Sequence, residues 1–305
     1  MNYSQEVIDF ISKRLDFSPT LLSDLINRKG NLYRVWYRKK GNKRRCVEEP
    51  LKELKSLQRK LLDGFFNFQH PKCVHGGVRK KSIRTNALEH KSSKYMLRLD
   101  IKNAYPSVTR KQIYQLYKSL GATVEMARIL TKLTTFRGHL PQGAPTSLPL
   151  FNILLSNLRL DSIFRYSVKG IKYTRYVDDL IFTSRKPLPK QLESEATKLL
   201  KENGFNVNRQ KTKRYSTKNR ALRITGVNII KGKPKLPPKL IKKFRGMIGR
   251  AIFDNTVSRD QVFGIIAFTI GIEKKIPNQL LKPFLRYLKT KNIKECSFVI
   301  NTEPI

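Results

Sequence analysis

Acidic residues are scarce in this chain, and the deficit restricts what the protein can bind. Its 305 residues include 63 Lys and Arg but only 22 Asp and Glu, a formal net charge of +41. So large an imbalance costs stability through self-repulsion unless a polyanion neutralises it, and nucleic acid is the commonest polyanion. A solubilising or membrane-facing surface would also be basic, but the size of the excess favours a nucleic-acid-binding protein.

Cysteines and long apolar runs are also few. Cys46, Cys73 and Cys296 form no Cys-x-x-Cys pair, which argues against a zinc site or a disulfide framework and suits a reducing compartment. No apolar run approaches the ~20 residues that span a bilayer. Residues 1–6 lack the basic and apolar regions of a signal peptide. We therefore expect a soluble, cytoplasmic protein that has no membrane partner.

Hydrophobic periodicity predicts an α+β chain of two or three subdomains. Alternating residues indicate strands and i, i+3, i+4 spacings indicate helices. The expected order is two N-terminal helices, a basic hairpin at 33–48, a helix at 51–65, a strand at 95–101, helices near 109–120, 123–134 and 147–158, a hairpin at 172–184, a helix near 189–203, short strands at 205–208 and 222–227, a linker at 231–238 and three helical patterns within 241–288.

Three of the few aspartates stand at informative places. Asp100 ends an apolar strand, while Asp178 and Asp179 form the tip of the predicted hairpin. Adjacent carboxylates repel one another unless a cation lies between them. Mg²⁺ prefers oxygen ligands, and two such ions about 3.5–4 Å apart can clamp the attacking and leaving oxygens of phosphoryl transfer. Taken alone, the pair could equally be a solvated turn and Asp100 a surface residue, so the assignment depends on the neighbouring motifs.

Three motifs occur in a fixed order, each in a suitable predicted setting: Asp100–Tyr105, Leu140–Ser147 and Tyr176–Asp179. Together they resemble the reverse transcriptase family, and the resemblance covers about residues 30–230. It implies a right-hand polymerase fold, with fingers and palm built from an antiparallel sheet plus helices, followed by a small helical thumb. The expected ranges are 1–95 for the N-terminal helices and fingers, 96–235 for the palm with part of the fingers at 110–140, and 236–305 for the thumb.

The resemblance also implies an activity and a metal site. The chain would be an RNA-directed DNA polymerase that uses two Mg²⁺ ions. Asp100, Asp178 and Asp179 would be the metal ligands and catalytic carboxylates, with Ile101 in the same metal set. Lys211, in the motif Asn208–Thr212, would donate a proton to the leaving pyrophosphate, although a surface lysine is the plain alternative.

Further residues would bind the deoxynucleoside triphosphate. Tyr105 would lie under the sugar and exclude a 2′-hydroxyl, unless it is only a core tyrosine. Gln142 and Gly143 would border the pocket, where a glycine lets the backbone approach the triphosphate closely. Lys81 and Arg84 lie where the family places cations on the triphosphate, but Arg79 and Lys80 compete for this role.

Two motifs resemble those of bacterial retron enzymes: Asn86–His90, an Asn-Ala-x-x-His signature, and Ile224–Gly226, which has Ile where the family has Val. We expect Asn86, His90, Thr225 and Gly226 to contact RNA, or Asn86 and His90 to brace the junction of fingers and palm. The retron resemblance implies four partners or products: a cognate structured non-coding RNA, a branched RNA–DNA product (msDNA) begun at an internal guanosine 2′-hydroxyl, a host RNase H, and an accessory effector in phage defence. We expect no RNase H, endonuclease or maturase segment.

The predicted thumb is basic on one face. Lys239, Lys242, Lys243, Arg245 and Arg250 interleave with apolar residues, so one face can pack while the other meets phosphates. An ordinary solvated face would show the same pattern. Two other interpretations remain open: a group II intron-like or diversity-generating reverse transcriptase, and an RNA-binding scaffold that restrains an effector. The intact set of aspartates argues against the scaffold as a sole function.

Overall fold

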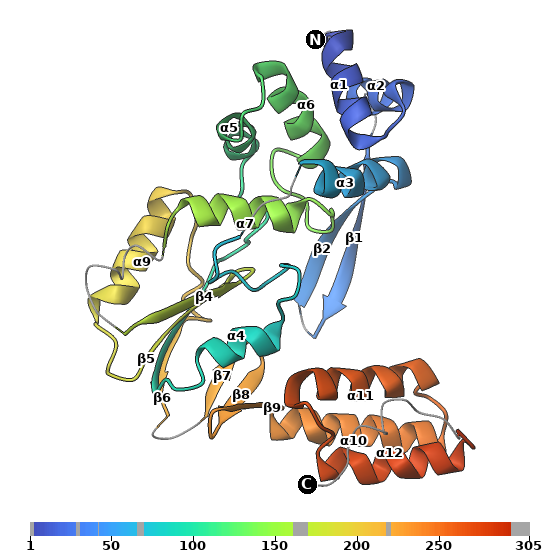
Figure 1. Cartoon of the computed structure of the whole chain (residues 1–305), viewed down its shortest axis with the longest axis vertical. Coiled ribbons are helices and arrows are strands. Elements are labelled where there is room, and N and C mark those ends of the chain that lie inside the picture. The colour runs from blue at the N-terminus through green and yellow to red at the C-terminus, as the bar shows by residue number, and fades with distance from the viewer. Residues whose placement is uncertain are drawn as a thin grey trace.

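The computed structural model describes residues 3–28, 31–41, 43–65, 70–160, 170–217 and 221–293. It is a mixed α+β structure in which a central antiparallel sheet lies between an N-terminal helical region and a C-terminal helical bundle (Figure 1). The helices are α1 (Gln5–Leu15), α2 (Pro19–Asn27), α3 (Lys52–Phe65), α4 (Ile83–Glu89), α5 (Arg110–Ser119), α6 (Val124–Thr134), α7 (Ser147–Asn157), α9 (Gln191–Glu202), α10 (Pro238–Phe253), α11 (Arg259–Glu273) and α12 (Asn278–Thr290). The strands are β1 (Tyr33–Lys40), β2 (Lys43–Pro50), β3 (Tyr95–Asp100), β4 (Lys172–Tyr176), β5 (Asp179–Ser184), β6 (Lys213–Ser216), β7 (Leu222–Ile224), β8 (Val227–Ile230) and β9 (Lys233–Lys235).

The central sheet has the strand order β4-β5-β3-β6, and all of its pairs are antiparallel. Both of its faces are covered. Leu97, Leu99 and Phe182 pack into a core shared with α7 and α9, whereas Met96 and Ile181 on the opposite face pack against α4 and the β7–β9 sheet. Because successive strand residues point to opposite faces, β3 contributes buried side chains to both faces of the sheet. Packing on both faces of the sheet therefore fixes the position of the end of β3, where Asp100 stands.

The N-terminal helices and a projecting hairpin form the second region. Helices α1–α3, α5 and α6 share the main apolar core. The β1–β2 hairpin extends from this core, and Figure 1 shows its tip directed toward the side of the C-terminal bundle that carries α11. Trp36 and Tyr37, midway along β1, are exposed.

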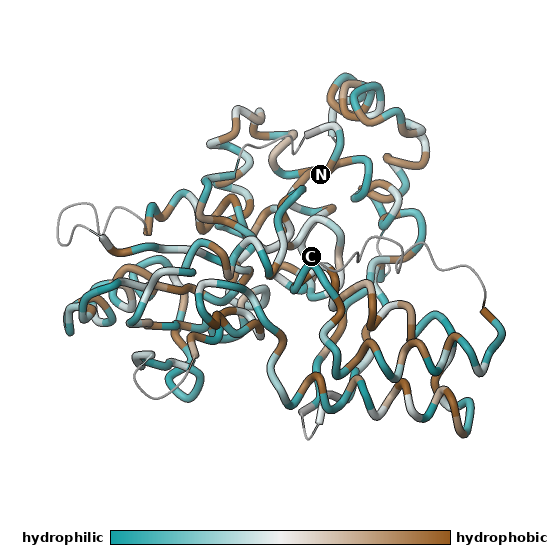
Figure 2. The backbone as a smooth tube through the Cα atoms, turned by 60° about the horizontal axis from the view of Figure 1, so that its bottom comes forward, coloured by the Kyte–Doolittle hydropathy of each residue, from teal (hydrophilic) through white to brown (hydrophobic). Residues whose placement is uncertain are grey.

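The C-terminal bundle, which we call the thumb, consists of α10, α11 and α12. Its own apolar cluster includes Ile248, Ile266 and Phe284, and hydrophilic and hydrophobic residues alternate along its helices in Figure 2. Ile272 of α11 belongs instead to the cluster that contains Ala87 of α4 and the β7–β9 strands. The thumb is therefore attached to the central sheet through α4 and this small sheet.

Three local predictions differ from the structure. Residues 205–208 are not a strand, because only Val207 forms a bridge, with Ile101. The single strand expected at 222–227 is a hairpin whose turn residues Thr225 and Gly226 both have positive φ, 44° and 89°. The expected linker contains β9, in which Pro234 is tolerated because it stands in an edge strand. Among the described residues no helix is long and apolar enough to cross a membrane.

Candidate active site

The three predicted aspartates are brought together by strand pairing. Asp100 and Asp179 stand directly opposite one another, at the end of the β3–β5 ladder. Asp178 precedes Asp179 in the turn, and its carbonyl accepts a hydrogen bond from the amide of Ile101 at 3.0 Å. The carbonyl of Asp100 accepts one from the amide of Asn208 at 2.7 Å. The backbone therefore holds both strand ends together at a fixed register.

This cluster is electrostatically strained. Burial raises the pKa of Asp178, and the charges of Asp179 and Asp100 raise it further. Burial also raises the pKa of Asp179, against the opposing effect of Arg98. Carboxylates crowded in a poorly solvated place disfavour their own ionisation unless a cation neutralises them. Such a site is suited to binding cations.

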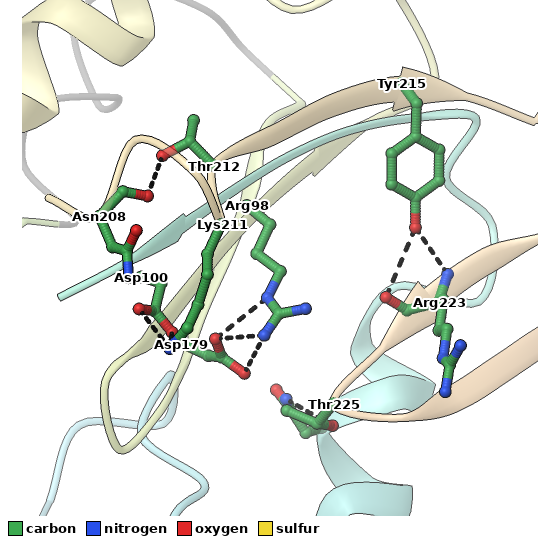
Figure 3. A network of polar contacts seen from close by, with 10 residues as sticks. Arg98, Asp100, Asp179, Asn208, Lys211, Thr212, Tyr215, Arg223 and Thr225 are labelled. Carbon is green, nitrogen blue, oxygen red and sulfur yellow. Dashed lines mark hydrogen bonds and ion pairs between the residues drawn. The ribbon is translucent and has the colours of Figure 1, made fainter. Parts of the chain in front are cut away.

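Two basic side chains already supply positive charge (Figure 3). Lys211 Nζ lies 2.8 and 3.0 Å from the two carboxylate oxygens of Asp100. Arg98 binds Asp179 in a forked arrangement, with Nη2 at 2.7 and 2.9 Å and Nε at 3.0 Å. Lys211 was predicted to act in the site from its motif, whereas Arg98 was not, although alternation in β3 places Arg98 on the same face as Asp100.

The aspartates fit a divalent cation by donor type and placement. Three aspartates stand at the adjoining ends of two paired strands, and hard cations prefer carboxylate oxygen ligands. As the side chains lie, no three His, Cys, Asp or Glu groups of the described residues converge around one point. Lys211 and Arg98 hold two of the carboxylates, so metal binding would require an exchange of these cations for the ion. Ile101 is apolar and buried, so only its carbonyl oxygen could act as a ligand.

The tip of the β4–β5 hairpin is conformationally constrained. Val177 has φ of 58°, a region that β-branched residues rarely adopt and that costs on the order of 1–3 kcal/mol. Gly76 packs against this residue so closely that a Cβ there would lie 2.6 Å from the amide nitrogen of Val177. The loop before α4 is also bonded to β4, from the amide of His75 to the carbonyl of Arg175. These contacts hold the turn in its strained conformation.

The predicted nucleotide residues flank the same region. Tyr105 packs on Phe151 of α7 with ring centroids 5.6 Å apart, and burial together with Asp178 raises its pKa to about 12. Gly143 has φ of 141° and is exposed, and a Cβ there would lie 3.0 Å from the carbonyl oxygen of Glu48. Gln142 is half-buried, and its main chain is bonded to Glu48. The loop before α7 thus lies against strand β2 of the projecting hairpin.

Two predicted triphosphate contacts are engaged elsewhere. Lys81 Nζ donates to the carbonyls of Lys72 and Val74, and burial lowers the pKa of Lys81. Arg84 Nε donates to the carbonyl of Ile272 in the thumb, at 3.1 Å. These bonds do not fit the predicted triphosphate contact for either side chain. They instead stiffen the loop before α4 and join α4 to α11.

The two retron-like motifs meet each other inside the protein. His90 and Asn86 are fully buried. The ring nitrogens of His90 lie 2.7 Å from the hydroxyls of Thr183 and Thr174, and Asn86 Nδ2 donates to Thr225 Oγ1 at 3.4 Å. Burial lowers the pKa of His90 to about 3, so the ring is neutral. The prediction that Asn86 and His90 contact RNA does not fit this burial, and the alternative that they brace a junction does.

Other predicted RNA contacts are accessible. Gly226 is exposed and Thr225 is half-buried at the β7–β8 turn. On α10, the five predicted basic residues are all exposed, and they comprise Lys239, Lys242, Lys243, Arg245 and Arg250. The apolar residues between them pack inside the thumb or against its junction. An exposed row of cations beside a packed face is suited to phosphate contacts.

The β1–β2 hairpin is a functional candidate that the motif analysis left without a role. Its register places Arg38 opposite Arg45 and Lys39 opposite Arg44. Like charges that face one another across a strand pair are destabilising, and all four side chains are exposed. A bound polyanion would relieve this repulsion. The run of basic residues between 38 and 45 was the available signal.

Comparisons with known proteins relate the chain to one family and to several relatives. Residues 37–229 match the family described as reverse transcriptase (RNA-dependent DNA polymerase). The chain is 26% identical to the retron Ec86 reverse transcriptase of Escherichia coli over 277 residues, which is 89% of this chain and 86% of that relative. It is 34% identical to the retron Mx65 reverse transcriptase of Myxococcus xanthus over 207 residues, which is 61% of this chain and 48% of that relative. Several curated relatives are thus about twice as long as the region they share with this chain.

Among solved structures the chain resembles telomerases. The structure of telomerase from Candida albicans, solved with a fragment of telomeric RNA, matches 96% of this chain and 58% of that chain, with a TM-score of 0.51 and 13% identity. The apo telomerase of Candida tropicalis has a TM-score of 0.52 at 12% identity. At such low identity the likeness concerns the fold, which is the right-hand arrangement of a polymerase.

Proposed function

This chain belongs to the reverse transcriptase family, and we propose that it copies part of a structured RNA into DNA at the Asp100, Asp178 and Asp179 cluster. The observation that carries the proposal is the placement of these aspartates beside Lys211 and Tyr105 at one end of the central sheet. Its RNA-directed DNA polymerase activity follows from the family. The substrate RNA, the metal stoichiometry and the roles of individual residues are the proposed part.

The carboxylates would hold two Mg²⁺ ions, as the family generally uses divalent metals. When bound, the ions supply charge neutralisation at the attacking and leaving oxygens. Asp178 and Asp179 contribute a turn held rigid by Gly76 and by the Asp178–Ile101 hydrogen bond. Lys211, which is bonded to Asp100, would have to leave this carboxylate for a metal to bind there and would then be able to protonate the leaving pyrophosphate. Its exposure, 47% of the side chain, leaves room for that movement.

Nucleotide selection rests on Tyr105 and on the loop that contains Gln142 and Gly143. Tyr105 is held by Phe151 near Asp178, where its ring would meet C2′ of an incoming sugar. Exposed Gly143 presents its backbone without a Cβ. The cations of the β1–β2 hairpin would make the triphosphate contact first assigned to Lys81 and Arg84, because they are exposed and that hairpin lies against the Gly143 loop.

The RNA partner is proposed from the relatives and from the two retron-like motifs. We infer a cognate structured non-coding RNA, a branched msDNA product begun at a guanosine 2′-hydroxyl, and deoxynucleoside triphosphates as substrates. A host RNase H and an accessory effector in phage defence belong to the same proposal. The exposed cations of α10 support binding to a polyanion. They do not select RNA sequence, because phosphate contacts position a nucleic acid without reading its bases.

Primer extension on an RNA template with Mg²⁺ tests the polymerase site. We expect extension by the wild type and none by an Asp178→Ala/Asp179→Ala variant. The matched control is Asp9→Asn, which changes an exposed carboxylate on α1 and should extend normally. Equal extension by the wild type and the double variant would show that these aspartates are not the catalytic centre.

Nucleic acid that copurifies with the protein from cells carrying its own locus tests the retron part. We expect a short DNA that carries RNA attached through a branch. RNase treatment should remove most of this RNA and so make the whole molecule slightly smaller. The same preparation from the double variant should contain the RNA but no DNA. Linear DNA without attached RNA in the wild-type preparation would contradict branch-primed synthesis while leaving the polymerase assignment intact.

A further inference from the structure

A buried carboxylate in the projecting hairpin reaches the nucleotide loop. Glu48 of β2 is 6% exposed. Its Oε2 accepts a hydrogen bond from the amide of Gln142 at 3.3 Å and lies 3.0 Å from His139 Nε2, while Oε1 lies 3.2 Å from the same nitrogen. In return, the amide of Glu48 donates to the carbonyl of Gln142 at 2.9 Å. Both main-chain groups of Gln142 are therefore bonded to one residue of another element.

The neighbouring residues make this contact tight. A Cβ on Gly143 would lie 3.0 Å from the carbonyl oxygen of Glu48 and 3.1 Å from Cγ1 of Val47, so glycine is what lets β2 come so close. His139 is fixed independently, by its backbone bonds with Phe136 and by its bridge to Thr109. Glu48 thus lies between a fixed histidine and the loop residue that borders the pocket.

The position of this acid is unusual in so basic a chain. Its neighbour Glu49 is paired with Arg34 and Lys55 at the hairpin surface, whereas the contacts of Glu48 include no Lys or Arg among the described residues. A buried carboxylate is costly unless its oxygens accept hydrogen bonds. Every bond that satisfies Glu48 ties the hairpin to the loop at residues 139–142, so the two cannot separate without leaving this charge unsatisfied.

We propose that Glu48 and His139 are a positioning pair for the nucleotide pocket, which sets the distance between the Gln142–Gly143 loop and the cationic β1–β2 hairpin. Neither side chain touches the reacting atoms. The pair acts by holding Gln142 and Gly143 where the triphosphate enters, so its loss weakens nucleotide binding more than it slows chemistry. This inference rests on the proposed assignment of Gln142 and Gly143 to the nucleotide pocket.

Steady-state primer extension with varied deoxynucleotide concentration tests the pair. For Glu48→Ala we expect KM for the nucleotide to rise about tenfold, the loss expected when an amide and a histidine lose a shared acceptor, with kcat at saturation within about twofold of wild type. Glu48→Gln keeps a carbonyl oxygen in place of Oε2 and should restore most of the binding. Glu49→Ala is the matched control, one residue along the same strand, and should leave KM unchanged.

A double-mutant cycle and a binding measurement separate positioning from simple stabilisation. His139→Ala should raise KM like Glu48→Ala, and the combined variant should be no worse than either, because the two residues act as one unit. The dissociation constant for primer–template should stay at the wild-type value in all four proteins. The inference is overturned if Glu48→Ala lowers only the melting temperature with KM unchanged, or if KM rises equally for Glu49→Ala. An inactive wild type would instead overturn the proposed function.

Discussion

Polar groups gather at two places on the central sheet, and they are balanced in opposite ways. At the aspartate cluster, burial and mutual repulsion raise the pKa of Asp178, and Lys211 and Arg98 only partly compensate the negative charge. At the α4 junction, a neutral His90 is held between two threonine hydroxyls, and Ser93 donates to one of them. The aspartate cluster keeps unbalanced negative charge, to which a cation can bind. The α4 junction contains a neutral histidine, which allows α4 to pack against the central sheet.

The difference separates chemistry from assembly. Both places come from short motifs that resemble those of known polymerases, so a motif alone does not tell which of the two it serves. Burial and hydrogen bonding decide it. The α4 junction joins β4 and β5 through His90, the β7–β8 turn through Asn86, and the thumb through Arg84. We therefore expect mutations at the two places to act on different measurable quantities.

The largest contrast is expected for Asp178→Asn. Primer extension should fall by at least ~1000-fold, about 4 kcal/mol in the barrier, because a metal ligand is lost. The free energy of unfolding should stay the same or rise, because the folded state disfavours the ionised form of Asp178 and Asn is neutral. Extension assays and denaturant melts on the same preparation measure both. A destabilised variant would mean that Asp178 is structural.

The opposite pattern is expected for His90→Ala. Removing the ring takes the His90 partner from Thr174 and one of two partners from Thr183, and it leaves a small cavity. Together these losses should cost about 3 kcal/mol of stability. Extension at 25 °C by the folded fraction should remain. Denaturant melts compared with Lys91→Ala, an exposed neighbour, measure the effect. Loss of primer extension in a fully folded His90→Ala protein would instead indicate that His90 acts in the polymerase active site.

The protonation of His90 gives a smaller effect that depends on pH. Its folded pKa of about 3 lies below the ordinary value of 6.5, so the unfolded chain binds more protons between these values. The contribution of His90 to the free energy of unfolding is therefore fully present above pH 6.5 and decreases as the pH falls. From pH 7 to pH 5 the expected loss is about 2 kcal/mol. Melts of wild type and His90→Gln across this range should show a shallower slope for the variant. Parallel slopes would assign the acid sensitivity elsewhere.

The smallest effect is expected for Asn86→Ala. Its hydrogen bond to Thr225 is long, 3.4 Å, and its Oδ1 has no hydrogen-bond partner within the described part of the chain. Removal of a poorly bonded buried amide should cost about 1 kcal/mol or less. A loss as large as that of His90→Ala would mean that the Asn86–Thr225 contact supports the thumb more strongly than its geometry indicates. Parallel denaturant melts of both variants measure the difference.

Much of the fold and part of the site could be predicted from the sequence, for local reasons. Strict alternation predicted the strand that ends at Asp100, and a threonine cap with a following glycine predicted α5. The hairpin at 172–184 and its tip at Asp178 were also predicted. Residues 205–208 were wrongly predicted as a strand, because alternation over four residues does not show whether a neighbouring strand is available for pairing.

Long-range contacts explain why some predicted site contacts do not fit the observed hydrogen bonds and burial. The sequence shows that Lys81 and Arg84 are cations near a polymerase motif. It does not show that both donate hydrogen bonds to backbone carbonyls. Nothing in the spacing of Asn86 and His90 indicates burial, because their partners Thr225, Thr183 and Thr174 lie far along the chain. Arg98 and Glu48 belong to no recognised motif. Only their contacts, with Asp179 and Gln142 respectively, identify them as neighbours of the candidate site.

By itself, the sequence determined the basic character of this protein, its class of fold and the aspartates at the end of one strand and the tip of one hairpin. These follow from composition and from periods of two or 3.6 residues, which are local properties. The tertiary structure alone decided which polar side chains keep their charge at the surface of the site and which are neutral in the interior. That choice depends on desolvation and on partners tens of residues away, because the free energy of a charge is set by its surroundings and not by its neighbours in sequence.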